Sequence, residues 1–569
     1  MIKNLHIFFD LIDKKLKKNF IVNIFGSFLV MILEIFSIAL VFPAIGFLLN
    51  EDISESNPFM KTEFAKFVFV AFRDFPIKDL IIFFLIFFGF AYLIKVIVTL
   101  FFGWRNSKFA FDVRTYLAVR LNRLYIEQPY NYHVKNNSSK IIHHLSHEIN
   151  LIAQGCNSLL IFITELSVIV GLTLFFVIYQ PFIMLCLFIV MIPTIYLFRK
   201  IKKFVSELSN IRQFHDKKTM FIITQTFSGI KDLLVVNKSK IFTEKYNENI
   251  SLSSKANSKN SFAVLLPRNI LELFLIFGIG LIAFYIPMES NNYKSELLKI
   301  MAAFAIVSFR IMPALTRIIV SINTMSFMFP VLQGYYKLVS KLEKSRKKPI
   351  ERKKINFQTI RIKNLSFKYG KKFIFKNFSA TIKKNEKIGI IGESGSGKTT
   401  LINIILGLLK IHKGEIVLLD KNNKFLSRIQ NLRISHVPQE VFLFDDTLKN
   451  NICMPGNKKI DEKLLKKVIK QADLEKFVKK LPNGLNNRVG ERGSKVSGGQ
   501  KQRIGIARSL YHDTDLLIFD EITSSLDSKS ESNIMRLISK IKDKTIILIT
   551  HKKKNLIVCN KVINLNNLN

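Results

Sequence analysis

The most regular feature of the sequence is a series of long apolar runs, separated by polar loops, that ends near residue 322. Each run approaches the roughly 20 apolar residues that a helix needs to cross the hydrocarbon core of a bilayer. We therefore predict six membrane-spanning helices. They lie at about 20–48, 80–104, 154–178, 181–199, 264–287 and 297–322. Only Tyr179, Gln180 and Pro181 separate the third run from the fourth, which predicts a tight turn.

Lysine and arginine are concentrated in two long loops, which join the second span to the third and the fourth span to the fifth. The loop before the second span is instead acid-rich, as Glu51 and Asp52 illustrate. The positive-inside rule therefore places the basic loops and both chain termini in the cytosol. Because these loops are too long for simple turns, we expect the spans to continue into the cytosol as helices. They would turn near Tyr130–Ser139 and Ser228–Val236.

Two further apolar segments are too short to cross a bilayer. Residues 1–19 carry apolar side chains at helical spacing and predict an amphipathic helix on the membrane surface, with an ordinary buried amphipathic helix as the alternative. The segment Pro58–Phe72 predicts an interfacial helix on the outer side, with a loop that has a hydrophobic tip as the alternative.

The pattern changes after about residue 338, where a charged stretch at 339–354 predicts a linker between domains. Beyond it, short β-type runs such as Lys387–Ile391, Leu516–Phe519 and Thr545–Ile549 alternate with helical patterns. This alternation is typical of an α/β domain built on a largely parallel sheet. The chain is thus predicted to contain a membrane domain at 20–338 and a second domain at 355–569.

The composition agrees with a membrane protein. Hydrophobic residues make up 49% of the 569 positions, and the formal net charge is +43. This combination excludes a plain cytosolic enzyme and a disordered polybasic protein. No stretch has the pattern of a nucleic-acid reader, so we expect no nucleic-acid partner. The four cysteines are far apart and predict neither a disulfide framework nor a zinc site.

The first chemical motif is a glycine-rich loop at Gly392–Thr399, which follows the strand Lys387–Ile391 and opens a helix at Thr400. It matches the pattern G-x-x-x-x-G-K-[ST]. Its glycines let backbone N–H groups wrap a phosphate, Lys398 neutralises the β- and γ-phosphate oxygens, and Thr399 offers a hydroxyl to Mg²⁺. The loop therefore predicts nucleotide binding.

The second motif is the apolar run Leu516–Phe519, which ends in the carboxylates Asp520 and Glu521. Asp520 can hold Mg²⁺, and Glu521, which points differently, can polarise the water that attacks the nucleotide. Such a strand alone is a weak signal. Behind a phosphate-binding loop, it predicts ATP hydrolysis.

Between these motifs stands Val496-Ser-Gly-Gly-Gln500, which resembles the signature motif of ATP-binding cassette (ABC) proteins, with Val496 in place of the usual leucine. Gln439 is similar to the family's Q-loop glutamine, Asp527 to its D-loop aspartate and His551 to its switch histidine. Tyr369 stands where the family stacks an aromatic ring on adenine. The resemblance covers essentially the whole chain, as six spans followed by one cassette.

The resemblance implies an α-helical membrane domain of the type IV ABC exporter kind, with six transmembrane helices and cytosolic helical extensions, followed by an α/β P-loop nucleotide-binding domain. It assigns catalysis to Glu521, His551 and Gln439, and Mg²⁺ binding to Thr399, Gln439 and Asp520. The residues expected to bind ATP are Tyr369, Gly392, Glu393, Ser394, Gly395, Ser396, Gly397, Lys398, Thr399, Thr400, Ser497, Gly498, Gly499, Gln500 and Asp527.

In this family, two cassettes meet head to tail, so that the signature of one caps the ATP bound by the other. A chain with one cassette needs a second half-transporter, most simply a second copy of itself. The resemblance therefore implies a homodimer with two ATP sites. It also implies a multi-pass protein of the bacterial inner membrane with a cytosolic cassette.

Charged residues inside the predicted spans are candidates for substrate binding, because a charge in the membrane is costly and usually faces a cavity or a partner. The candidates are Glu34, Lys95, Arg268, Arg310 and Arg317. Arg310 and Arg317 lie seven residues apart on one face of the sixth span. Glu165 is a further charge within a span. Snorkelling is the alternative for Arg268 and Arg317, and Arg268 could simply pair with Glu272.

Cationic side chains in such a cavity suit a substrate with a phosphate or pyrophosphate head. The stretches Leu33–Pro43, Gly229–Asp232 and Phe309–Ile318 are similar to bacterial lipid-linked oligosaccharide flippases of the PglK type. That resemblance implies a polyprenyl-pyrophosphate-linked oligosaccharide, moved from the cytosolic to the outer leaflet. The alternatives are export of drugs or of another lipid and, in a different class, an ATP-gated channel or regulator with little turnover.

Overall fold

The computed structural model describes residues 2–40, 77–179, 181–285, 293–346, 352–454, 456, 459–524 and 526–566, and for part of the helices at 179–202 and 264–308 it describes the backbone alone. The predicted outer helix at Pro58–Phe72 lies outside these residues. The chain forms two compact units. The first comprises Met1–Gln128 and His133–Arg346, and the second comprises Pro129–Tyr132 and Lys347–Asn569.

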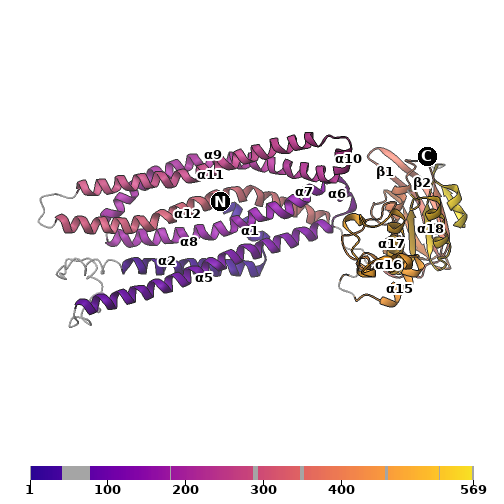
Figure 1. The fold of residues 1–569 in the computed structure, drawn as a ribbon, viewed down its shortest axis with the longest axis horizontal. Helices are drawn as coiled ribbons and strands as arrows, with labels where there is room; N and C mark the ends of the chain where they lie inside the picture. Colours follow the sequence, from indigo (N-terminus) through magenta and orange to yellow (C-terminus); the bar gives the residue numbers. More distant parts are fainter. Residues whose placement is uncertain are drawn as a thin grey trace. The chain divides into compact units, whose positions relative to one another are not determined.

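The first unit is helical throughout its described residues, and its longest helices run along one another (Figure 1). Helix α9 packs along α11, and α8 packs along α12 and α2. The helices of residues 2–346 are α1 (Ile2–Leu11), α2 (Lys14–Ala39), α5 (Ile77–Ile126), α6 (Tyr130–Lys135), α7 (Ser138–His143), the π-helical turn η2 (His144–Glu148), α8 (Ile149–Tyr179), α9 (Pro181–Ser228), α10 (Ile230–Val235), α11 (Ser239–Tyr285) and α12 (Tyr293–Ser345). The start of α6, up to Tyr132, belongs to the second unit.

The predicted helical extensions are confirmed. Helices α5, α9, α11 and α12 have 50, 48, 47 and 53 residues, about twice what a bilayer requires. The chain turns at the short helices α6, α7 and α10, where the sequence placed its turns. Within the described residues, Lys14–Ala39, Leu85–Ile126, Ser138–Ile178 and Phe309–Ser345 are long and apolar enough to cross a membrane.

The N-terminal segment differs from the single surface helix expected at 1–19. Its helix ends at Leu11, and α2 begins at Lys14 because the Asp13 side chain accepts a hydrogen bond from Leu16 N at 2.8 Å and caps the new helix. Phe8, Leu11 and Phe20 are buried inside the unit. The apolar face of this segment therefore packs on protein, as the alternative of a buried amphipathic helix proposed.

The linker predicted at 339–354 is shorter than expected, because α12 continues to Ser345. Val339 and Leu342 are buried, and Gln128 Nε2 donates a 2.9 Å hydrogen bond to Leu342 O. The charged residues of the segment that lie in this helix, Lys341, Glu343 and Lys344, are on its exposed side. Composition alone does not separate the two faces.

The second unit contains two sheets. The five-stranded sheet has the order β6-β7-β8-β3-β9, and all of its strand pairs are parallel, which confirms the predicted parallel α/β sheet. The four-stranded sheet, β2-β1-β4-β5, is antiparallel and was not expected from the sequence. The strands are β1 (Thr359–Tyr369), β2 (Lys372–Lys383), β3 (Lys387–Ile391), β4 (Lys413–Leu419), β5 (Phe425–Arg428), β6 (Ile434–Val437), β7 (Leu516–Asp520), β8 (Thr545–Ile549) and β9 (Lys561–Asn564).

Helices pack on both sheets and close two cores of buried aliphatic and aromatic side chains. Strands β7 and β8 lie at the centre of the parallel sheet and are buried along almost their whole length, as strands covered on both faces must be. The helices are α13 (Lys398–Ile405), α14 (Leu448–Cys453), α15 (Glu462–Gln471), α16 (Glu475–Lys480), α17 (Gly498–Tyr511) and α18 (Ser528–Ser539), with short 3₁₀ turns that include η6 (Lys553–Val558).

Candidate nucleotide-binding and translocation sites

The glycine-rich loop joins β3 to α13, and the helix begins at Lys398, two residues earlier than predicted. Gly397 caps the helix with a φ of +96°, a conformation that residues with a Cβ rarely adopt. A Cβ at Gly397 would also lie 2.6 Å from Ile374. Glycine is therefore required here, and the loop directs the N-terminal end of α13 to the space that a phosphate would occupy.

Lys398 holds this loop together from within. Its Nζ donates hydrogen bonds to Gly392 O at 2.8 Å and to Glu393 O at 2.9 Å, and the residue is buried. Ser396 Oγ is also buried, and it has no hydrogen-bond partner among the described residues. An unsatisfied hydroxyl and a buried ammonium in one loop fit an anionic ligand that accepts hydrogen bonds.

The predicted acidic pair and the predicted histidine meet at the ends of two neighbouring parallel strands. Asp520 ends β7, and Glu521 follows it with a φ of +48°, a strained conformation for a residue other than glycine. This turn carries the Glu521 carboxylate toward the segment after β8. There, His551 Nε2 lies 2.6 Å from Glu521 Oε1. The geometry pairs the expected catalytic carboxylate with the expected switch histidine.

Gln439 follows strand β6 and connects three motifs. Its Nε2 donates to Ser524 Oγ at 3.0 Å, and its backbone oxygen accepts a 2.6 Å hydrogen bond from Gln502 Nε2. Gln502 belongs to α17, the helix that follows the signature. Its buried amide thus ties the Q-loop to the signature helix, a role that the sequence did not reveal.

The signature motif forms the start of α17. Ser497 caps the helix in a capping box: Ser497 N donates to Gln500 Oε1 at 2.9 Å, and Gln500 N donates to Ser497 Oγ at 3.4 Å. A Cβ at Gly498 or Gly499 would meet only ordinary contacts, at 3.7 Å or more. Open glycines at a helix N-terminus let a phosphate approach the backbone closely.

Tyr369 and Asp527 complete the predicted nucleotide set. Tyr369 ends β1, packs edge-to-face with Phe367 with centroids 5.0 Å apart, and is 50% exposed, which leaves ring surface that can stack on a base. Asp527 caps α18 by accepting a hydrogen bond from Ser530 N at 3.0 Å. Hydrogen bonds from Ser530 lower the pKa of Asp527, which keeps the cap ionised.

The residues expected to hold Mg²⁺ fit that ion chemically. Thr399 is exposed at the start of α13, and the Asp520 carboxylate is partly exposed at the end of β7. The amide nitrogen of Gln439 is engaged by Ser524, which leaves its amide oxygen available. Carboxylate, hydroxyl and amide oxygens are the hard ligands that this cation prefers.

The charges of the membrane helices form a chain of ion pairs across four helices. Lys95 Nζ of α5 lies 3.0 Å from Glu34 Oε1 of α2, and Arg310 of α12 also pairs with Glu34. Arg310 lies 3.9 Å from Glu165 Oε2 of α8, and Arg317 Nε lies 2.7 Å from Glu165 Oε1. We call these five residues the ion-pair chain. All five lie inside spans that the sequence predicted.

This arrangement qualifies the prediction that Arg310 and Arg317 bind substrate, because both cations already have carboxylate partners within the ion-pair chain. Glu34 and Glu165 are nearly buried, with side chains 4% and 10% exposed, whereas Arg317 remains 48% exposed. Arg268 lies in α11, and its side chain is not among those described. The expected contact between Arg268 and Glu272 therefore stays a prediction.

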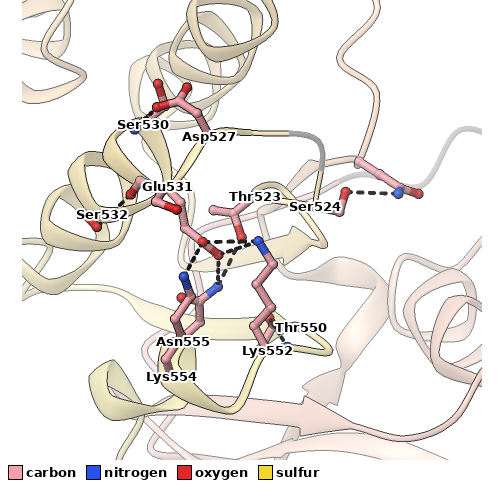
Figure 2. Close-up of polar contacts among 12 residues, drawn as sticks. Thr523, Ser524, Asp527, Ser530, Glu531, Ser532, Thr550, Lys552, Lys554 and Asn555 are labelled. Atoms are coloured by element: carbon pink, nitrogen blue, oxygen red, sulfur yellow. Dashed lines mark hydrogen bonds and ion pairs between the residues drawn. The ribbon is translucent and has the colours of Figure 1, made fainter.

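The sequence did not identify Glu531, a buried carboxylate of the second unit. It lies in the first turn of α18, is 2% exposed, and contacts Lys552, Lys554 and Asn555 (Figure 2). The run Lys552–Lys554 has the composition of an exposed basic face, so nothing in it indicates a buried partner. The four-residue spacing of Asp527 and Glu531 was the available signal, since it places both on one face of a helix.

The sequence matches models of two known protein families. The model described as the ABC transporter transmembrane region matches residues 20–312, just over half of the chain, and the model described as ABC transporter matches residues 375–524. The chain belongs to the ABC transporter family.

Curated relatives and a solved structure resemble the chain. It is 42% identical over 198 residues to the ATP-dependent lipid A-core flippase of Pseudoalteromonas translucida, and this match spans only about a third, 34%, of each protein. It is 28% identical over 469 residues to the lipid A-core flippase of Wigglesworthia glossinidia brevipalpis, covering 79% of this chain and 78% of the relative. A bacterial Atm1-family ABC exporter with ATP bound superposes with a TM-score of 0.74 at 17% identity, over 97% of this chain and 94% of that chain. The predicted exporter fold is confirmed.

Proposed function

We propose that this chain is one half of a homodimeric, ATP-driven exporter that flips a lipid with an anionic head from the cytosolic to the outer leaflet of the inner membrane. The preferred substrate class is a polyprenyl-pyrophosphate-linked oligosaccharide. The proposal of an anionic head rests on the ion-pair chain, in which three cations share two carboxylates.

ATP hydrolysis is assigned to the second unit. Lys398 and the N-terminus of α13 would bind the β- and γ-phosphates, and Tyr369 would stack on adenine. Glu521 would accept the proton of the attacking water, and His551, 2.6 Å from its carboxylate, would hold that carboxylate in place. Thr399, Gln439 and Asp520 would hold Mg²⁺, which supplies positive charge to the transferring phosphoryl group when bound.

The dimer is proposed because the signature and the phosphate loop need a partner. Ser497, Gly498 and Gly499 at the start of α17 present a helix N-terminus suited to a phosphate. Family resemblance assigns that phosphate to the nucleotide of the opposite copy. A homodimer would then hold two equivalent sites, and ATP would favour the closed state.

The substrate assignment follows from the net charge of the ion-pair chain. Two carboxylates cannot neutralise Lys95, Arg310 and Arg317 together, so one positive charge is left over. Arg317 is the most exposed of the three cations. A diphosphate could accept hydrogen bonds from the exposed part of the Arg317 guanidinium while Glu165 keeps its contact with Nε, so no buried carboxylate would lose its partner.

The names of the relatives favour a second candidate within the same class, a flippase for another anionic lipid such as lipid A-core. Drug export does not need the excess cation. An ATP-gated channel or regulator does not need a complete catalytic pair at Glu521 and His551.

Reconstituted flipping separates these possibilities. The chain is placed in proteoliposomes with fluorescent polyprenyl-pyrophosphate glycan or with fluorescent lipid A-core, and the fraction protected from an external reagent is followed with ATP. We expect Arg317→Gln to reduce glycan-lipid flipping at least about tenfold while ATP hydrolysis continues. Arg123→Gln, at an arginine of the same unit whose side chain is 76% exposed, is the matched control. Normal flipping by Arg317→Gln would refute the assigned site, and transport of lipid A-core alone would favour the second candidate.

A further inference from the structure

Glu531 joins two segments of the nucleotide site that are separate in the sequence. Lys552 Nζ lies 3.1 Å from Glu531 Oε1, and Lys554 Nζ lies 2.7 Å from Glu531 Oε2. Asn555 Nδ2 donates to Glu531 Oε1 at 2.8 Å. Figure 2 shows these groups converging on one carboxylate at the first turn of α18. The contact spans from the helix after the D-loop to the segment that begins with His551.

Asn555 extends the connection to the loop after Glu521. Its Nδ2 also donates to Thr523 Oγ1 at 3.1 Å, and Asn555 is 4% exposed. Thr523 lies two residues beyond Glu521. One buried amide therefore touches both the helix that carries Glu531 and the loop that carries the catalytic carboxylate.

His551 itself has little packing to hold it. Its side chain is 47% exposed, and the described contact of its ring is with Glu521. Its position is therefore set by its backbone, which lies between Thr550 and Lys552. Lys552 N donates to Thr550 Oγ1 at 3.1 Å, and the Lys552 side chain donates a hydrogen bond to Glu531. Because these contacts restrict the backbone of Lys552, they also restrict the backbone of the adjacent His551.

We propose that Glu531 is a positioning residue for ATP hydrolysis, which fixes the backbone at His551 against the loop from Glu521 to Asp527 so that the imidazole meets the catalytic carboxylate. This inference rests on the proposed function. Glu531 acts through His551 and does not touch the nucleotide itself.

Glu531 stays negatively charged and can therefore keep its hydrogen bonds from Lys552, Lys554 and Asn555. Burial acts to raise its pKa, but hydrogen bonds from Lys554, Asn555 and Lys552 outweigh burial and lower the pKa to about 2. The carboxylate thus stays ionised well below neutral pH. Removing it would leave two lysines and a buried amide without their shared acceptor.

The test is a double-mutant cycle on the full-length chain in lipid nanodiscs, with ATP hydrolysis measured as kcat and KM. We expect Glu531→Gln to lower kcat about tenfold and to change the KM for ATP by less than about twofold. His551→Ala should lower kcat at least as much. If Glu531 acts through His551, adding Glu531→Gln to His551→Ala should cost almost nothing further.

A second variant guards against loss of folding. Lys552→Met removes an exposed partner of Glu531 and leaves the buried carboxylate with Lys554 and Asn555, so we expect it to fold and to lower kcat about threefold. Glu462→Gln, at an exposed carboxylate of α15 that pairs with Lys449 of α14, is the control and should keep the wild-type rate.

Each outcome decides between alternatives. Multiplicative effects of Glu531→Gln and His551→Ala, or an unchanged kcat in both Glu531→Gln and Lys552→Met, would overturn the positioning role. A purely structural role would lower the thermal midpoint and the active fraction without lowering kcat per active site. If wild type and Glu462→Gln both fail to hydrolyse ATP, the proposed function falls and this inference falls with it.

Discussion

Glu521 and His551 are held together by the backbone of two adjacent strands as well as by their side chains. Asp520 is in register with Ile549, and Glu521 N donates a 3.1 Å hydrogen bond to Ile549 O. The two side chains then leave neighbouring strand ends and meet at 2.6 Å. The sheet therefore brings the segments that carry these two side chains together before any nucleotide binds.

Replacing Glu521 by Gln is expected to lower ATP hydrolysis about 100-fold or more while ATP still binds, because the amide keeps the shape but cannot accept the proton of water. The measurement is steady-state phosphate release together with binding of a fluorescent ATP analogue. Glu415→Gln, on the exposed part of β4, should hydrolyse ATP normally. An unchanged rate in Glu521→Gln would remove this residue from the catalytic step.

Mixing subunits tests the composite ATP site. In a head-to-tail dimer, a Lys398→Ala copy and a Ser497→Arg copy together retain one intact site, since each lacks a different half. Random pairing should then restore roughly a quarter of the wild-type activity. Neither variant should be active alone. Failure of the mixture to regain activity, with heterodimers shown by tagged purification, would contradict a site shared between copies.

Replacing Glu34 by Gln should destabilise the membrane unit, because Lys95 and Arg310 would lose their shared carboxylate while remaining largely buried. Breaking a buried ion pair from one side costs about 3–5 kcal/mol. The thermal midpoint in detergent should fall by several degrees. Glu343→Gln, at a more exposed pair with Arg120, should have a much smaller effect. Equal midpoints in the two variants would argue against the buried chain of ion pairs.

Acid should weaken the second unit through Glu531. Burial opposes ionisation, but the donated hydrogen bonds lower its pKa from 4.5 to about 2, so its contribution to stability is complete above about pH 4.5. That contribution is lost as the pH falls from 4.5 toward 2. Thermal midpoints of wild type and Glu531→Gln should therefore converge over this interval. A constant difference between them would show that the carboxylate is not held by its ionised form.

Local motifs predicted the segments that the structure brings together at the candidate nucleotide site. The loop at Gly392–Thr399 and the carboxylates after Leu516–Phe519 depend on a strand that ends in a turn, and their positions along the chain carry that information. The antiparallel sheet was missed because its strands have mixed burial patterns, such as the exposed β5. The contacts of Glu531 were missed because its partners follow more than 20 residues later.

In the membrane unit too, some features were predicted from the sequence and others were not. The lengths of the apolar runs predicted helices and turns, but not that the N-terminal segment breaks at Asp13 or that α12 reaches Ser345. Where these helices begin and end depends on what each helix face packs against, and the composition of a segment does not show which surface it contacts.

By itself, the sequence determined which segments form helices that can enter a membrane and which loop can bind a phosphate, because both follow from contacts between residues close along the chain. Only the tertiary structure decided the partners of the isolated charges. Lys95 reaches Glu34 across 61 residues, and Asn555 reaches Glu531 across 24. The cost of burying a charge requires a partner, but it is the packing of helices and strands that selects which one.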